Sequence, residues 1–223
     1  MRLETSSPNG TVDKLTTPMA MSDPGRHAAL FDGLPRDTGA LAETVQGLMI
    51  HQHIAPAYGV TLSRDQQAQS HVRAVEKILG DIAARDGRPL SIARAPGARQ
   101  VGVCRHFTLL HVAMLRTQGI PARARCGFGA YFEKDKYIDH WVTEYWNEAR
   151  NRWVLFDSQI DDRQRELSGS GSIQQTSRGI SSWWRAMPGR AAVAEAPIRM
   201  PSASSTCTDF GSSRATSSAT SPL

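Results

Sequence analysis

The chain has 223 residues, of which 40% are hydrophobic and 21% charged, so it is long enough to form one globular domain with a substantial core. Its formal charge of +5 is uneven: residues 168–223 carry five Arg against Glu195 and Asp209, which gives +3 and leaves +2 for the rest. The nearly balanced body has no basic stripe with interleaved aromatic residues, and no apolar run is long enough to span a bilayer. These features argue against nucleic-acid and membrane partners.

The sequence divides into three parts by composition. Residues 1–23 are polar and rich in Ser, Thr and Pro, which predicts a disordered leader. Residues 24–167 show the hydrophobic periodicity of a folded domain. Residues 168–223 contain 14 Ser and only sparse aliphatic residues without a period, which predicts a disordered tail.

Two helices are expected at the start of the folded part. Asp37 or Thr38 can serve as the N-cap of a first helix that runs to about His53. A capping-box pattern at Ser63 begins a second helix, which is expected to end near Gly87. A loop rich in Pro and Gly then leads to the central segment of the chain.

The central segment, VCRHFTLLHVAMLRTQGIPAR, predicts an amphipathic helix that begins at Cys104. Apolar residues follow Cys104 at steps of three and four, and Gly119 and Pro121 supply the stop signal. A thiol at a helix N-terminus lies beside unpaired N–H groups and the positive end of the helix dipole, both of which favour the thiolate. Cys104 is therefore a candidate nucleophile, although a small core side chain is the alternative.

Strands are expected after Pro121, first over 122–132 and then in a hairpin. DHWVTEYW alternates apolar and polar residues, and RWVLFD reads as the returning strand. His140 and Asp157 are expected to lie side by side on this hairpin, against the Cys104 helix. Asp157 is preferred over Asp139, Asp161 and Asp162 because the returning strand places it level with His140. Cysteine, histidine and a carboxylate form the constellation that nucleophilic acyl transfer requires.

These segments resemble a known family. GVCRHFTLLHVAMLRTQGIPARARCGF, followed by DHWVTEYW and RWVLFDS, is similar to the core of the transglutaminase-like superfamily over about Gln100–Asp161. The resemblance implies an α+β fold with a papain-like core, in which helices pack on a small antiparallel sheet. It also implies that Cys104, His140 and Asp157 are the catalytic triad.

The predicted activity is thiol-dependent acyl transfer or hydrolysis of an amide or peptide. The oxyanion is expected to bind the backbone N–H of Cys104 and a second donor, for which Gln100 is the candidate. The triad requires neither metal nor cofactor, so none is expected. The alternatives are a non-catalytic binding module with the same fold, an inactive truncated product, and a metal-binding protein.

A metal site would have to use the other histidines and cysteines. His51 and His53 lie two apart on an expected helix and cannot face one another. The remaining candidates lack the paired spacing of zinc ligands; they are Cys104, His106, His111 and Cys126.

The cysteines also bear on localisation. Cys104, Cys126 and Cys207 are too few and too scattered for a disulfide framework, and Cys126 is expected to be a buried strand residue. The first ten residues lack the apolar region of a secretory signal. A cytoplasmic, reducing location is therefore expected.

The tail suggests one further hypothesis. Its excess of Ser, Ala and Arg is what GC-rich codons produce when they are read out of frame. Shifting GC-rich codons for residues 168–190 back by one base permits FGIRFDPDVPRDQFLVAGDAWAR, which has the patterning that the tail lacks. Residues 168–223 are thus a candidate frameshifted remnant of a folded C-terminal half.

Overall fold

The computed structural model describes residues 15–129, 132 and 137–167, which form helices and two small sheets. The predicted mixture of helix and sheet is confirmed. The α-helices are α2 (Thr38–Leu48), α3 (Arg64–Ala68), α4 (Val75–Arg85), α5 (Cys104–Thr117) and α6 (Asp162–Leu167). The strands are β1 (Met49–His51), β2 (Gln100–Gly102), β3 (Ala122–Gly129), β4 (Ile138–Asn147) and β5 (Arg152–Phe156). Short 3-10 helices are η1 (Gly25–Phe31), η2 (Ala55–Tyr58), η3 (Gln69–His71), η4 (Pro96–Ala98) and η5 (Glu148–Arg150).

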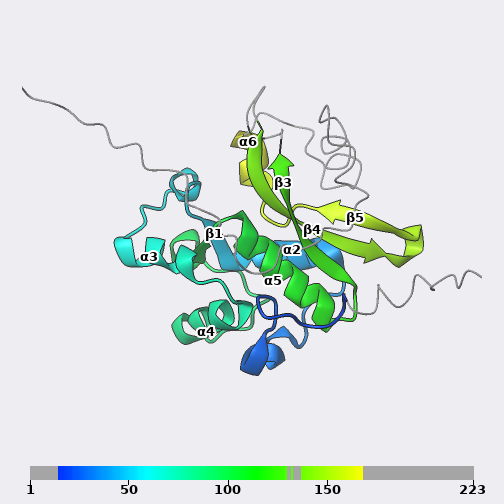
Figure 1. The fold of residues 1–223 in the computed structure, drawn as a ribbon. Helices are drawn as coiled ribbons and strands as arrows, with labels where there is room; N and C mark the ends of the chain where they lie inside the picture. Colours follow the sequence, from blue (N-terminus) through cyan, green and yellow to red (C-terminus); the bar gives the residue numbers. More distant parts are fainter. Residues whose placement is uncertain (1–14, 130–131, 133–136, 168–223) are drawn as a thin grey trace, which may run out of the picture. The chain divides into compact units, whose positions relative to one another are not determined.

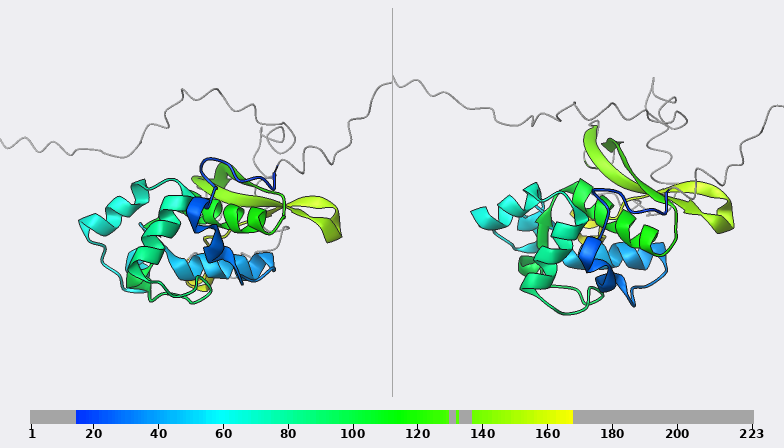
Figure 2. Two further views of the ribbon diagram at one scale, coloured as in Figure 1. Left: turned by 90° about the horizontal axis from the view of Figure 1, so that it is seen from below. Right: turned by 60° about the horizontal axis from the view of Figure 1, so that its bottom comes forward.

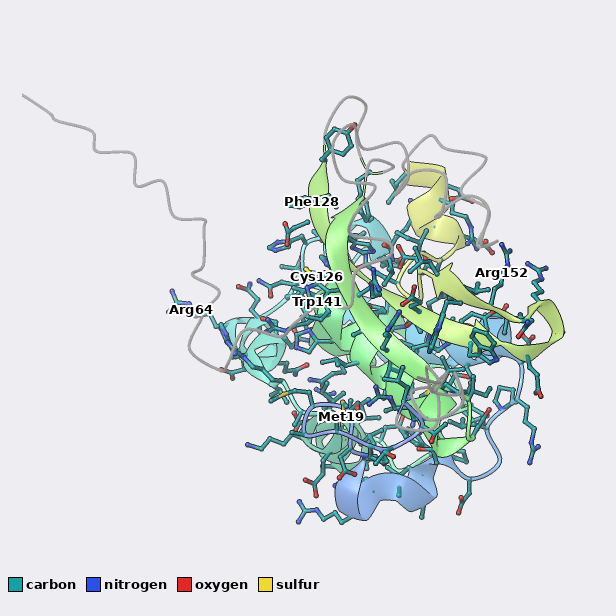
Figure 3. The ribbon with its side chains drawn as sticks, turned by 45° about the vertical axis from the view of Figure 1, so that its right-hand side comes forward. Met19, Arg64, Cys126, Phe128, Trp141 and Arg152 are labelled. Carbon is teal, nitrogen blue, oxygen red and sulfur yellow. The ribbon has the colours of Figure 1, made fainter. Side chains whose placement is uncertain are left out.

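The larger sheet is an antiparallel meander in the order β3-β4-β5. Its β3–β4 register runs from Ala122 opposite Tyr145 to Gly129 opposite Ile138, so Cys126 pairs with Trp141, and these two lie next to each other in Figure 3. The predicted strands and hairpin are therefore present. Cys126 itself is exposed, which corrects the expectation of a buried thiol.

The smaller sheet was not predicted. It consists of β1 and β2 in parallel, with Met49 opposite Gln100 and His51 opposite Gly102. The first helix therefore ends at Leu48 instead of His53, because the next three residues form a strand with a segment 51 residues away. The predicted N-cap is confirmed, since Asp37 Oδ1 accepts a hydrogen bond of 2.9 Å from the Ala40 N–H.

The second predicted helix is divided in two. Its capping box is present at Ser63 and Gln66, but α3 is short and passes through η3 to an extended residue, Val72. The ring Nε2 of His106, on α5, lies 2.6 Å from the Val72 carbonyl oxygen. In a continuous helix this carbonyl would instead accept a hydrogen bond from the helix backbone. A new helix, α4, starts at Val75.

Helix α5 lies at the centre of the core. It contacts β3 and β4 on one side and α2, α4 and η1 on others, and Figure 1 shows it between the sheet and α4. Both views of Figure 2 show the helical segment from α3 to α4 on the side of α5 away from the β4–β5 hairpin. The predicted apolar face of α5 is buried; its members include Phe107, Leu110, Met114 and Leu115.

Residues 15–23, assigned to the leader from sequence, contact the folded body. The buried guanidinium of Arg116 donates to the carbonyl of Thr17 at 3.2 Å and to the hydroxyl of Ser22 at 3.0 Å. It also donates to the Ala122 carbonyl at 2.8 Å, so one α5 side chain links this segment to the start of β3. Residues 15–23 are thus held against the folded body by Arg116.

The remaining predictions about the ends of the chain concern residues 1–14 and 168–223, which lie outside the described residues. Within the part that the structure describes, each helix is too short or too polar to cross a bilayer.

Candidate functional site

The candidate nucleophile, Cys104, is the first residue of α5 and is partly exposed. Strand β2 ends two residues before it, so the pairing of β1 with β2 fixes where the helix begins. Gly102 allows a close approach there, because a Cβ at this position would lie 2.7 Å from Met49 Cε and 2.9 Å from His106 Cβ.

The ring of His106 holds the start of α5 in place. Its Nδ1 lies 3.0 Å from the Val103 N–H, which is one of the donors that a helix N-terminus leaves unpaired, and its Nε2 binds the Val72 carbonyl. Burial lowers the pKa of His106, and this keeps the ring neutral so that Nδ1 can accept. The sequence placed His106 among weak metal candidates and missed this structural role.

His140 on β4 and Asp157, directly after β5, form a buried pair. His140 Nε2 lies 2.7 Å from Asp157 Oδ2, and the side chains are 3% and 2% exposed. The second oxygen of Asp157 accepts a hydrogen bond of 2.9 Å from the Gln159 N–H, so both carboxylate oxygens are engaged. The ring of Phe132 meets the His140 ring edge-on with centroids 4.8 Å apart.

The side chain of Cys104 is a further hydrogen-bond partner of His140. Because Nε2 faces Asp157, the nitrogen left for the thiol is Nδ1. Burial opposes a charge on the ring, but the Asp157 carboxylate and the Cys104 side chain outweigh it and raise the pKa of His140. The arrangement therefore favours a proton on His140 next to a cysteine.

The rival carboxylates lie elsewhere. Asp139 is exposed on β4. Asp161 accepts hydrogen bonds from the Tyr58 hydroxyl at 2.7 and 2.8 Å and from the Gln164 N–H, and Asp162 pairs with Arg165. Asp157 is the carboxylate that the structure brings to His140.

Gln100, the predicted second oxyanion donor, is 1% exposed on β2. Its Oε1 accepts a hydrogen bond from the Arg85 guanidinium at the end of α4. Its Nε2 has no hydrogen-bond partner within the described part of the chain. The Gln100 side-chain N–H is thus available as a hydrogen-bond donor, but the side chain is buried.

His51, at the end of β1, lies near the candidate site, although the sequence considers it only as a metal candidate on an expected helix. Its ring lies 6.4 Å from that of Phe107, one turn after Cys104. Burial first, and then the charges of His53, His140 and His106, lower its pKa to about 3, while the Asp157 charge acts in the opposite direction. Its imidazole is therefore neutral at physiological pH and close to the His140–Asp157 pair.

The other metal candidates are dispersed. His111 is buried, with Nδ1 at 3.0 Å from the Thr143 hydroxyl and Nε2 at 3.1 Å from the Thr38 carbonyl. Across the described ranges, no group of three or more His, Cys, Asp or Glu side chains is arranged to hold a metal ion. The rings of His51 and His53 lie close together, with centroids 5.7 Å apart and planes tilted by 54°, which corrects the helix-based expectation.

Comparison with known proteins gives a family match for this region. Residues 57–158 match the sequence model of the Transglutaminase-like superfamily. The resemblance was expected to start at about Gln100, so the similarity begins well before the expected position. A Cytophaga hutchinsonii crystal structure, described as a "putative cysteine protease", is 16% identical with a TM-score of 0.40; the similarity covers 67% of this chain and 42% of that one. This chain therefore spans less than half of that protein. No curated protein matches. The matched residues 57–158 include Cys104, His140 and Asp157, so this part of the chain is similar to the transglutaminase-like superfamily.

Proposed function

We propose that this protein is a cysteine-dependent hydrolase of amide or peptide bonds, in which Cys104, His140 and Asp157 form a catalytic triad. The observation that supports this most strongly is the buried His140, hydrogen-bonded to Asp157 at 2.7 Å and to the Cys104 side chain. The match of residues 57–158 to the transglutaminase-like superfamily supports the same class of chemistry.

The first half of the proposed reaction forms a thioester. His140 takes the proton of Cys104, and the thiolate sulfur bonds to the substrate carbonyl carbon while the π electron pair moves to the oxygen. The oxyanion is held by the Cys104 backbone N–H and a second donor, for which the sequence proposes Gln100. The C–N bond then breaks as the carbonyl re-forms, and the leaving nitrogen takes the proton from His140.

The second half releases the acyl group. His140 takes a proton from water, whose oxygen attacks the thioester carbon, and the C–S bond breaks to give a carboxylic acid and the thiol. An amine in place of water gives acyl transfer. Asp157 holds the proton of His140 on Nε2, so that Nδ1 faces the sulfur in both halves.

The proposal is tested by comparing the reactivity of the cysteines. Brief iodoacetamide treatment of the folded protein, followed by peptide mass mapping, should label Cys104 at least about tenfold faster than Cys126 near neutral pH. Cys126 is the internal control, because it is the more exposed of the two. Cys207, which lies outside the described residues, serves as the third thiol. Equal labelling, or none at Cys104, would favour the non-catalytic binding module.

A second measurement tests the acyl step. Incubation with p-nitrophenyl acetate should add one acetyl group to Cys104, and the Cys104→Ala variant should not acquire it. A protein with no acetylation above that variant would not have the proposed activity.

A further inference from the structure

The ring of His51 lies in the candidate site without a role in the triad. Strand β1 pairs with β2 so that His51 is opposite Gly102, two residues before Cys104. The ring also lies 6.4 Å from that of Phe107, in the first turn of α5. These two contacts place the imidazole against the start of the helix that carries the candidate nucleophile.

The hydrogen bonding of His51 determines which nitrogen can act as a donor. The backbone N–H of His53 donates to Nδ1 at 3.3 Å, so the proton of the neutral ring is on Nε2. Nε2 makes no hydrogen bond to any residue in the described part of the chain. Residue His51 as a whole is only partly buried, whereas the candidate Gln100 is fully buried.

The charge state of His51 suits a donor that keeps its proton. Burial and the neighbouring histidines, including His140, lower the pKa of His51 to about 3. A neutral imidazole N–H can stabilise a developing oxyanion without transferring the proton, and it does not repel a protonated His140. A cationic ring, in contrast, could transfer its proton to the oxyanion and would repel a protonated His140.

We propose that His51 is the second oxyanion donor, with Nε2–H bound to the carbonyl oxygen of the substrate opposite the Cys104 backbone N–H. This inference rests on the proposed acyl chemistry and replaces Gln100 in that role. Gln100 is 1% exposed and its amide is held by Arg85, whereas His51 is only partly buried and its Nε2 is not engaged by another described residue.

The test separates attack at a carbonyl from attack at a saturated carbon. Acetylation of Cys104 by p-nitrophenyl acetate passes through an oxyanion, whereas alkylation by iodoacetamide needs a reactive sulfur but no oxyanion donor. Both rates are measured in single-turnover experiments on the full chain. His51→Phe and His51→Leu remove the donor, and two such variants guard against a folding defect in one of them.

Acetylation should fall about 10²- to 10³-fold in both donor-free variants, while alkylation stays within about threefold of wild type. His51→Gln, which returns an N–H near the position of Nε2, should recover part of the lost rate. His71→Ala is the control: it removes an exposed histidine that has no role in the candidate site, and it should change neither rate.

Three results would overturn the assignment. Unchanged acetylation in the donor-free variants would show that His51 does not contact the oxyanion, and a selective loss in Gln100→Ala would give the role to Gln100. An equal fall of both rates would mean that His51 acts on the thiol or on the fold. A wild-type protein that acetylates no faster than Cys104→Ala would remove the proposed function itself.

Discussion

Replacing Asp157 with Asn should disable the proposed site through the orientation of the His140 proton. In the native protein Oδ1 accepts from the Gln159 N–H and Oδ2 lies 2.7 Å from His140 Nε2. An Asn side chain has one oxygen and one NH₂, so it cannot accept at both places. If the oxygen stays with Gln159, the NH₂ faces Nε2 and forces the His140 proton onto Nδ1. A protonated Nδ1 can no longer accept the proton of Cys104.

The loss of charge acts in the same direction. Two unit charges about 4 Å apart at an effective dielectric constant of about 20 interact by about 4 kcal/mol, which corresponds to about 3 pH units in the ionisation of His140. Its pKa, raised in the native protein by Asp157, should therefore drop substantially in the variant. The equivalent change in a Ser-His-Asp triad lowers kcat by about 10⁴.

The assay is the single-turnover acetylation of Cys104 by p-nitrophenyl acetate near pH 7. We expect Asp157→Asn to reduce the rate by about 10²- to 10⁴-fold. The matched control is Asp139→Asn, which removes an exposed carboxylate from the residue next to His140 and should leave the rate within about twofold of wild type. A rate above half of wild type for Asp157→Asn, or an equal loss in both variants, would refute the triad.

Three other predictions concern stability and the coding sequence. Ser22→Ala should lower the free energy of unfolding by about 1–2 kcal/mol in urea denaturation, because the buried guanidinium of Arg116 loses an acceptor; no change would restore the disordered-leader interpretation for this segment. Burial lowers the pKa of His111 to about 4, so the unfolded chain binds the extra proton between about pH 6.5 and 4, and stability should fall as the pH drops through this window. The His111 contribution is about 3 kcal/mol at pH 4, and His111→Gln should show a correspondingly shallower pH dependence. Resequencing the coding DNA should show that the codons of residues 168–223, read one base back, encode a periodic sequence, whereas early stop codons in that frame would exclude a frameshift.

The elements that were predicted correctly are those whose signal is local. Helix α5 was located by apolar residues at steps of three and four, and it ends before Gly119, whose φ of 76° is a conformation that glycine adopts readily. The β4–β5 hairpin was located by the alternation of DHWVTEYW, and the pairing of His140 with Asp157 followed from the two strands being neighbours.

The elements that were missed depend on distant partners. Strands β1 and β2 have three residues each and pair in parallel across about 50 residues of chain, so neither segment carries its own signal. The break between α3 and α4 coincides with the contact between Val72 and His106, which lies 34 residues away. The exposure of Cys126 likewise depends on what covers β3, which alternation alone does not specify.

These distant contacts explain why the candidate site could be predicted only in part. The residues proposed as the triad lie on elements with clear local patterns, and the structure brings His140 and Asp157 together as expected. His51 and His106 lie beside Cys104 only because β1 pairs with β2 and because the helix start is bound to Val72. The small parallel sheet thus has two effects, since it fixes the start of the helix that carries Cys104 and brings the His51 imidazole against that helix. A residue that such a sheet brings to a site can be identified only when the register of the two strands is known.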